Sequence, residues 1–256
     1  MEMIDLHAHI LPNADDGSQS LKESLQMVRM AQQCGVRIIT ATPHCNMPGR
    51  FQNYISPKLE EELTRLRIAV KEEGLTTIIA KGAELFATLE LPELLRTGKV
   101  WTLNDTRYFL VEFDFFENPE FCNVVLEECA MYGFIPIIAH PERYAFVQRN
   151  PEIAYDWYCQ GYGIQINKGS ILGRFGQSSK ELGLLLLQHG LVSCVASDAH
   201  TAYMRTPHMA EVQSFLDMHF GVSFRHKITK DIPARILSGQ PMDGLKPVPF
   251  KTRYFG

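Results

Sequence analysis

Short runs of apolar residues alternate with longer amphipathic segments along almost the whole chain. The short runs are rich in β-branched residues and predict buried strands, whereas apolar positions three and four residues apart in the longer segments predict helices. The predicted strands cover residues 3–9, 36–41, 76–83, 108–113, 134–139, 162–167 and 191–197. The predicted helices cover residues 20–34, 56–73, 92–96, 119–132, 151–160, 179–189, 207–220 and 229–237. This pattern predicts seven strand–helix units.

Local signals support several of the predicted helix boundaries. Ser20, with Glu23 three residues later, forms a capping box at the start of the first helix. Ser56 followed by Pro57 suits the first positions of the second helix, and Gly74 suits its end. The helices are therefore predicted from two independent features, the apolar spacing and the caps.

The regular alternation of strands and helices indicates an α/β fold with parallel strands and outer helices. Without a linker or a break in composition, we expect one domain, residues 1–240, followed by a loose tail, residues 241–256. Seven units favour a closed or nearly closed (β/α) barrel. An open doubly wound sheet is the alternative, but the first strand leads into HAHILPNADDGS rather than G-x-G-x-x-G. The phosphate loop G-x-x-x-x-G-K-[ST] is also absent.

Composition narrows the classes of function. The 256 residues are 45% hydrophobic and 21% charged, which excludes a disordered chain, a collagen-like fibre and a coiled coil. A net charge of −4 offers no basic excess, so we expect no nucleic-acid partner. The N-terminus lacks the basic region of a signal peptide, and the longest apolar stretch, residues 182–197, is shorter than the ~20 residues of a membrane span. We expect a cytoplasmic protein without membrane insertion.

Histidines and carboxylates follow nearly every predicted strand. In a parallel barrel the carboxyl ends of the strands meet at one face, where active sites form. Each residue alone has an ordinary explanation, such as a hydrogen-bonded histidine or an aspartate that caps a turn. Their coincidence instead indicates two or three metal ions of a kind that binds both histidine and carboxylate, such as Zn, Mn or Fe. The candidates are His7, His9, Asp15, Asp16, His44, Glu84, Glu112, His140, Asp198 and His200.

These motifs resemble those of the PHP (polymerase and histidinol phosphatase) metal-dependent phosphoesterases. In order along the chain they are H-x-H, T-P-H, G-x-E, A-H-P-E-R and S-D-x-H, and the resemblance covers residues 3–240. The sequence is most similar to the bacterial manganese-dependent protein-tyrosine phosphatases of capsule and exopolysaccharide gene clusters, the CpsB/CapC type. The longest matching stretches are MIDLHAHILPNADDGS at the start, LNDTRYFLVEF at 103–113, IPIIAHPERY at 135–144 and VASDAHTAYMRTPHM at 195–209.

The resemblance implies a distorted (β/α)7 barrel that holds three divalent ions, with Mn²⁺ expected before Fe or Zn. The first ion would bind His7, His9, Glu84 and Asp198, the second Glu84, Glu112 and His140, and the third Asp16, His44 and His200. Asp16 is preferred to Asp15 because it directly precedes the glycine of D-D-G. Arg143 and Arg205 match the two arginines that bind phosphate in this family.

The resemblance also implies an activity and a partner. We expect a metal-dependent protein-tyrosine phosphatase whose substrate is a phosphotyrosine protein, a membrane tyrosine autokinase. Its role would be to regulate capsular or exopolysaccharide synthesis.

Three alternatives compete with this expectation. A thiol phosphatase with C-x5-R is disfavoured, because no arginine lies six positions after any of the six cysteines. A small phosphoester such as histidinol phosphate would suit the same metal site, since the ligands recognise phosphate and not the leaving group. Phe51 and Tyr54 are candidates for packing on a phenyl ring, or else into the helical layer. The last alternative is a non-enzymatic, metal-stabilised regulatory module.

Overall fold

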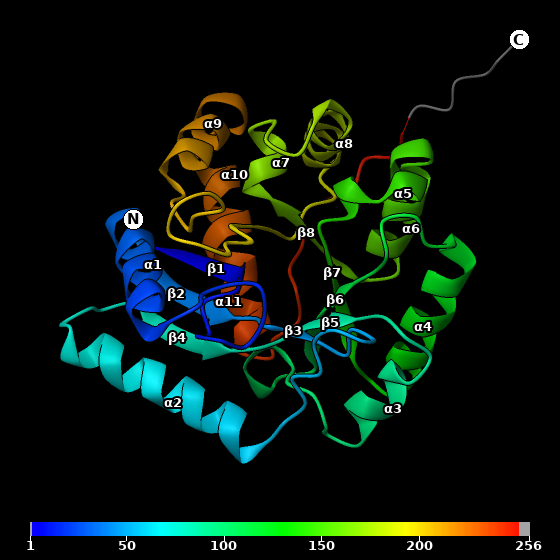
Figure 1. Cartoon of the computed structure of the whole chain (residues 1–256). Helices are drawn as coiled ribbons and strands as arrows, with labels where there is room; N and C mark the ends of the chain where they lie inside the picture. Colours follow the sequence, from blue (N-terminus) through cyan, green and yellow to red (C-terminus); the bar gives the residue numbers. More distant parts are fainter. Residues whose placement is uncertain (1, 251–256) are drawn as a thin grey trace, which may run out of the picture.

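The computed structural model describes residues 2–250 and places the strands inside a ring of helices (Figure 1). The end of the expected tail, residues 251–256, lies outside the described residues. The strands are β1 (Met3–Ala8), β2 (Val36–Ala41), β3 (His44–Cys45), β4 (Ile78–Lys81), β5 (Glu84–Phe86), β6 (Tyr108–Glu112), β7 (Ile135–Ala139), β8 (Gly163–Asn167) and β9 (Cys194–Ala196). The α-helices are α1 (Leu21–Gln33), α2 (Pro57–Glu72), α3 (Leu91–Arg96), α4 (Pro119–Met131), α5 (Ala145–Arg149), α6 (Glu152–Cys159), α7 (Lys168–Ile171), α8 (Gln177–Gln188), α9 (Ala210–Phe220), α10 (Val222–His226) and α11 (Ile232–Leu237). There are also two 3₁₀-helices, η1 (Leu103–Asp105) and η2 (Pro141–Arg143), and one π-helix, η3 (Lys227–Asp231), within residues 2–250.

The strands form two sheets that follow one another around the barrel. One sheet has the order β1-β2-β4 and the other β3-β5-β6-β7-β8-β9, and every pairing within residues 2–250 is parallel. The two sheets meet at two junctions, here called seams. At one seam, β2 and β4 of the first sheet each continue, after a short break, into a strand of the second sheet, β3 and β5 respectively. At the other seam an isolated bridge joins Ala8 to Ala199. The predicted α/β class of parallel strands with outer helices is confirmed, and the two seams distort the barrel.

The seam at which β2 continues into β3 and β4 into β5 has a local cause in the sequence. Pro43 separates β2 from β3 and cannot donate a ladder hydrogen bond. Gly82 separates β4 from β5 and lies so close to the neighbouring strand that a Cβ atom there would be 2.9 Å from Thr40 Cγ2. The strand predicted for residues 76–83 is confirmed as the shorter β4, and the separate strand β5, which begins at Glu84, was not predicted.

Other differences from the predicted elements are smaller. The strand expected over residues 191–197 is reduced to β9, where the Ser193 hydroxyl, instead of a ladder carbonyl, accepts a hydrogen bond from the Ile164 N–H at 3.1 Å. The last helix begins earlier than predicted, since α10 leads through the π-helical η3 directly into α11. The short helices α5 and α7 were not predicted. Both helical caps were predicted correctly, because the hydroxyls of Ser20 and Ser56 accept from backbone N–H groups three residues later.

Residues 241–250, here called the strap, do not form the loose tail that the sequence suggested. The Met242 N–H donates to the Tyr108 hydroxyl at 3.1 Å, and the Val248 N–H donates to the His189 carbonyl at 2.8 Å. Tyr108 begins β6, and His189 precedes β9. The strap therefore crosses the amino ends of these strands, opposite the end at which the candidate ligands gather.

Most strands are buried on both faces, as expected when helices cover a filled barrel, although β2 and β4 each have an exposed residue. Every residue of β1, β6 and β8 is buried, including the polar ones. None of the helices within residues 2–250 is long and apolar enough to cross a membrane.

Candidate metal centre

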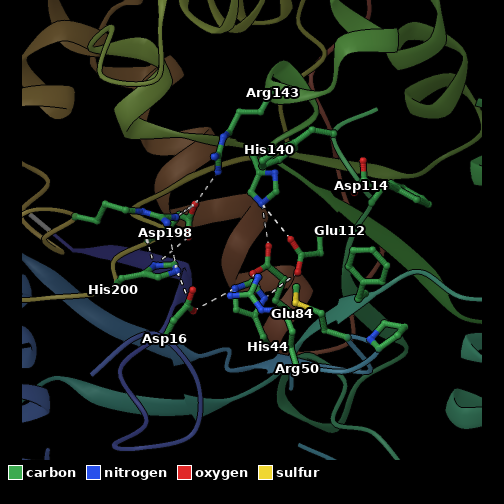
Figure 2. Close-up of a pocket in the computed structure, with 16 residues that line it drawn as sticks. Asp16, His44, Arg50, Glu84, Glu112, Asp114, His140, Arg143, Asp198 and His200 are labelled. Carbon is green, nitrogen blue, oxygen red and sulfur yellow. Dashed lines mark hydrogen bonds and ion pairs between the residues drawn. The ribbon is translucent and has the colours of Figure 1, made fainter. Parts of the chain in front are cut away.

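Most of the side chains proposed as ligands line one cavity at the carboxyl ends of the strands, and Figure 2 shows those that line it. The cavity has a volume of about 540 Å³. His7 and His9 are fully buried on β1 and just after it. The predicted residues that line the cavity are Asp16, His44, Glu84, Glu112, His140, Arg143, Asp198, His200 and Arg205.

Glu84 lies at the centre of this cluster. Its Oε2 atom is 3.1 Å from His7 Nε2, 3.2 Å from His9 Nε2 and 3.2 Å from His44 Nδ1. Its Oε1 atom is 2.9 Å from His140 Nε2. One carboxylate thus faces four imidazoles, an arrangement compatible with a ligand that bridges two ions.

Within residues 2–250, three groups of donor atoms are compact enough to hold an ion. They are His7, His9 and Asp198; His44, Glu84 and Glu112; and His9, Asp16, His44 and His200. The grouping of Asp16 with His44 and His200 agrees with the expected third ion. His44 also lies 2.8 Å from Glu112 through its Nδ1 atom, whereas His140 Nε2 is 4.0 Å from Glu112. His44 therefore lies between two of the three groups.

Outer partners orient the two histidines of the first strand. His9 Nδ1 is 2.7 Å from Asp15 Oδ2, and His7 Nδ1 is 2.8 Å from Gln165 Oε1. The two Nε2 atoms are left facing each other 3.2 Å apart. A carboxylate or carbonyl on the outer nitrogen is the usual partner of a metal-binding histidine, because it fixes the tautomer and the ring orientation.

The neighbouring aspartates Asp15 and Asp16 have different surroundings. Asp15 is buried behind His9, and it also accepts a hydrogen bond from the His44 N–H at 2.8 Å. Asp16 faces the cavity, 3.6 Å from the Nε2 atoms of both His44 and His200. This geometry favours Asp16 as the ligand and Asp15 as the residue that orients His9.

Sequence reasoning missed a polar chain on β8. The Gln165 side-chain amide donates to Asn167 Oδ1 at 2.8 Å, and the Asn167 amide donates to Asp198 Oδ2 at 2.6 Å. Together with the contact between Gln165 and His7, this chain links two candidate ligands. The available signal was the pair of amides two residues apart in the strand YGIQIN, which places both on one face.

Some donor atoms of the cluster lack hydrogen-bond partners within the protein and suit a divalent cation as their partner. His44 Nδ1 and Glu112 Oε1 are buried and have no hydrogen-bond partner of acceptable geometry, although they lie only 2.8 Å apart. Buried polar atoms without partners are rare and costly. A cation between such atoms would satisfy both, and imidazole with carboxylate is a donor set for Mn, Fe or Zn.

The carboxylates of Glu84 and Asp198 and the imidazole of His200 are in the forms that bind metal. The pKa values of His7, His9 and His44, by contrast, are raised, because despite burial the neighbouring carboxylates favour their protonated forms; metal binding would displace these protons. Burial favours the neutral form of Glu84, yet His7 and His44 hold the pKa of its carboxyl well below its usual value. Burial acts in the same direction on Asp198, and His7 again outweighs it, so that the pKa of this carboxyl is also low. Burial and the neighbouring His9 lower the pKa of His200 to about 2. Charged carboxylates and a neutral imidazole are the ligating forms.

Two candidate ligands occupy unusual backbone conformations. His140 has a φ angle of +35° and Asp198 one of +48°, both in the left-handed region that non-glycine residues seldom adopt. Such conformations persist at functional sites because the surrounding structure enforces them. The turn at His140 leads directly into η2, whose last residue is Arg143.

Arg143 and Arg205 meet at the wall of the cavity. Arg143 Nη1 is 3.7 Å from Asp198 Oδ2, and Arg205 Nη2 contacts the same oxygen atom. Arg205 Nη1 is 3.3 Å from His200 Nε2. Two fork-shaped donors thus lie beside the ligand cluster, an arrangement suited to a tetrahedral oxyanion.

The cysteines offer no activated nucleophile at this site. Cys45 follows a candidate ligand in the sequence, but its side chain is fully buried, and burial raises the pKa of its thiol to about 12. The thiolate is the nucleophilic form, so Cys45 is inert near neutral pH. This agrees with the absence of C-x5-R.

The aromatic residues considered for a phenyl ring do not line the cavity. Phe51 stacks on His44 with ring centroids 5.7 Å apart, and the Tyr54 hydroxyl donates to Asn46 Oδ1 at 3.0 Å. The apolar part of the lining comes instead from Met47, Pro48, Phe86, Phe113 and Phe115.

Comparisons with known proteins agree with this geometry. The family described as capsular polysaccharide synthesis, CpsB/CapC, matches residues 3–238. The tyrosine-protein phosphatase YwqE of Bacillus subtilis is 34% identical over 251 residues, which cover 98% of each chain. The tyrosine-protein phosphatase CpsB of Streptococcus pneumoniae is 32% identical, over 93% of this chain and 99% of the relative.

Solved structures are similar as well. A structure from work on YwqE of B. subtilis and CpsB of S. pneumoniae, described as unique metal-dependent tyrosine phosphatases, matches with a TM-score of 0.89 and 33% identity, covering 97% of this chain and all of that one. The histidinol phosphate phosphatase of Lactococcus lactis, solved with zinc, L-histidinol and phosphate, matches with a TM-score of 0.53 over 88% of this chain and 92% of its own. At 14% identity, the latter likeness concerns the fold alone.

Proposed function

The chain belongs to the CpsB/CapC family of capsular polysaccharide synthesis, and from this membership we propose that it is a metal-dependent protein-tyrosine phosphatase. The observation that carries the proposal is Glu84 among four imidazoles, beside two arginines that reach the same cavity. Such a cluster provides cation ligands on one side and phosphate donors on the other.

We further propose three divalent ions, with Mn²⁺ as the native metal. The ligands would be His7, His9, Glu84 and Asp198 for the first ion, Glu84, Glu112 and His140 for the second, and Asp16, His44 and His200 for the third. The contacts of Glu84 with four histidines support its bridging role. The position of His44 beside Glu112 makes it a further candidate for the second ion.

When bound, the ions would supply Lewis acidity and lower the pKa of a water molecule toward neutrality. The chain supplies the rest of the chemistry. Arg143 and Arg205 would donate to phosphate oxygens and offset charge as it develops in the transition state. Asp15 and Gln165 hold His9 and His7 in the orientation that faces the cavity.

The substrate that we propose is phosphotyrosine on a partner protein, a membrane tyrosine autokinase. The proposed role of the protein, which would act in the cytoplasm, is to regulate capsular or exopolysaccharide synthesis. The apolar side of the cavity, with Phe86, Phe113 and Phe115, suits a phenyl ring better than the polar imidazole of histidinol phosphate. A phenolate is also a good leaving group that needs little protonation.

Removal of the metal should abolish this activity. We expect a chelator to eliminate turnover of p-nitrophenyl phosphate and added Mn²⁺ to restore it, because the proposed reaction depends on the Lewis acidity of the bound ions. The kcat/KM value for a phosphotyrosine peptide should exceed that for histidinol phosphate at least ~10-fold. Full activity in the chelated protein would contradict the metal mechanism. A preference for histidinol phosphate would support the alternative of a small phosphoester substrate. A protein with full metal content but no turnover would support the alternative of a non-enzymatic regulatory module.

Replacement of the buried thiol beside His44 should have little effect. We expect Cys45→Ala to keep turnover within about twofold of wild type, because a buried, protonated thiol takes no part in the reaction. The measurement is kcat with p-nitrophenyl phosphate at matched metal content. Loss of catalysis in a folded, metal-loaded Cys45→Ala protein would restore the thiol mechanism.

A further inference from the structure

The unit formed by β8, α7 and α8 carries none of the proposed ligands, yet it reaches both arginines of the cavity. Phe175 lies in the loop between α7 and α8. The Arg143 Cζ atom is 4.5 Å from the centroid of the Phe175 ring, and the Arg205 Cζ atom is 5.5 Å from it. One aromatic ring is therefore shared by two guanidinium groups from distant parts of the chain.

A second ring completes the contact on Arg143. The centroid of Phe115 is also 4.5 Å from the Arg143 Cζ atom. Phe115 follows β6 and lines the cavity. Arg143 thus lies over two phenyl rings, whereas Arg205 lies over Phe175 alone among the Phe, Tyr and Trp rings of residues 2–250.

The loop that carries Phe175 is fixed in place by its own contacts. Its ring packs so closely on α7 that a Cβ atom at Gly169 would lie 2.6 Å from it. Arg174, the preceding residue, pairs with Glu211 of α9 at 2.6 Å. Gly176, the next residue, has a φ angle of +92°, which a side chain would strain. Close packing on α7 therefore holds the ring in place, while the exposed pair of Arg174 and Glu211 adds little.

Stacking has a particular advantage for a guanidinium group that must bind phosphate. Aromatic faces attract cations within about 6 Å of the centroid. All five N–H donors of arginine lie in the plane of the group, so contacts on its faces leave the donors free. Ion pairs, by contrast, occupy those donors.

Asp198 is the ion-pair partner that competes for these donors. Its Oδ2 atom contacts both guanidinium groups, and it also accepts from Asn167. Asp198 is itself a proposed metal ligand, so its charge would be shared with a cation. The arginines then need another contact to keep their places, and Phe175 provides it without taking a donor.

We propose that Phe175 is the positioning residue of the two phosphate-binding arginines. Its ring holds Arg143 and Arg205 together, so that their in-plane donors converge on one phosphate, and Phe115 completes the stack on Arg143. The identity of the bound anion rests on the proposed function. The placement of the two guanidinium groups is a property of the chain alone and can be tested separately.

The test compares Phe175→Leu with Phe175→Tyr, which keeps the aromatic face. The control is Phe220→Leu, because Phe220 is also half-buried but stacks on Phe224 at 5.0 Å and not on an arginine. In metal-loaded protein we expect the inhibition constant of inorganic phosphate to rise ~10-fold in Phe175→Leu and to stay near wild type in the other two. Metal content should be equal in all four proteins.

A double-mutant cycle separates positioning from a general loss of structure. Once Arg143→Ala has removed one stacked group, Phe175→Leu should weaken phosphate inhibition less than it does in wild type, because coupled residues are not additive. Full additivity, or wild-type phosphate inhibition in Phe175→Leu, would overturn the proposal.

A spectroscopic measurement tests the geometry without any activity. In metal-free protein the Nε–Hε resonance of Arg143 should be shifted upfield by the two rings, and Phe175→Leu should remove a large part of that shift. If Phe175→Leu does not fold, Phe115→Leu removes the more exposed ring and should give a partial loss. An unchanged resonance in the folded variant would overturn the proposal. If wild type shows the ring shift but no phosphatase activity, only the proposed function fails.

Discussion

Glu84→Ala should remove more metal and more activity than any other single substitution in the cavity. Glu84 faces His7, His9, His44 and His140 with its two oxygen atoms, so its loss affects two proposed ions at once. Loss of Lewis acidity withdraws several kcal/mol of transition-state stabilisation, and we therefore expect turnover to fall ~10³-fold or more. Elemental analysis of the purified protein and kcat with p-nitrophenyl phosphate measure the two effects.

A matched control separates metal loss from destabilisation. Asp217 accepts a 2.6 Å hydrogen bond from the buried Arg225, far from the cavity in the α9–α10 region. Asp217→Asn should lower the free energy of unfolding, because it weakens the partner of a buried charge, but leave metal content unchanged. Wild-type metal content and activity in Glu84→Ala would show that the ligand assignment is wrong.

The second large effect is expected at the two arginines. Arg143→Ala and Arg205→Ala should each lower turnover ~10²–10³-fold, because each removes a charged donor to the transition state. Metal content should stay near that of wild type, since neither side chain is a proposed ligand. Inhibition by phosphate and by vanadate should weaken in parallel. Lysine at either position should restore only part of the activity, because an ammonium group lacks the forked geometry.

A purely structural role for Arg143 and Arg205, in which they only form ion pairs, predicts a different result. If they only formed surface ion pairs, their removal would have an effect similar to that of Arg29→Ala. Arg29 pairs with Glu73 at 2.8 Å and is exposed, and such pairs contribute little. Near-normal turnover and phosphate inhibition in the Arg143→Ala, Arg205→Ala double variant would rule out the phosphate-binding role.

The sequence predicts the parts of the site that follow from strand periodicity. His7 and His9 are two residues apart and lie on one side of the first strand and its extension, where their Nε2 atoms meet. His140 and Asp198 follow buried apolar runs, so the barrel alone brings them to one face. Their convergence needed no knowledge of side-chain contacts. Their roles as ligands stay predictions until metal is measured.

The parts that escaped prediction depend on contacts between distant segments. Nothing in the local pattern around Phe175 indicates that its ring meets Arg143 and Arg205, because the three residues come from three different strand–helix units. The polar chain through Gln165 and Asn167 likewise depends on contacts with other strands, namely with His7 and Asp198. The break at Gly82 reflects the crowding of a neighbouring strand. Propensity describes a segment alone, and these features arise only when segments pack together.

The strap has a practical consequence for experiments on large substrates. It carries residues 241–250 across the amino ends of β6 and β9, on the side of the barrel away from the cavity. A fluorescent reporter or an affinity tag attached to the strap itself would lie on the far side from the arginines. Proteins immobilised in that way would present their cavities outward, which suits binding assays with an intact phosphorylated protein.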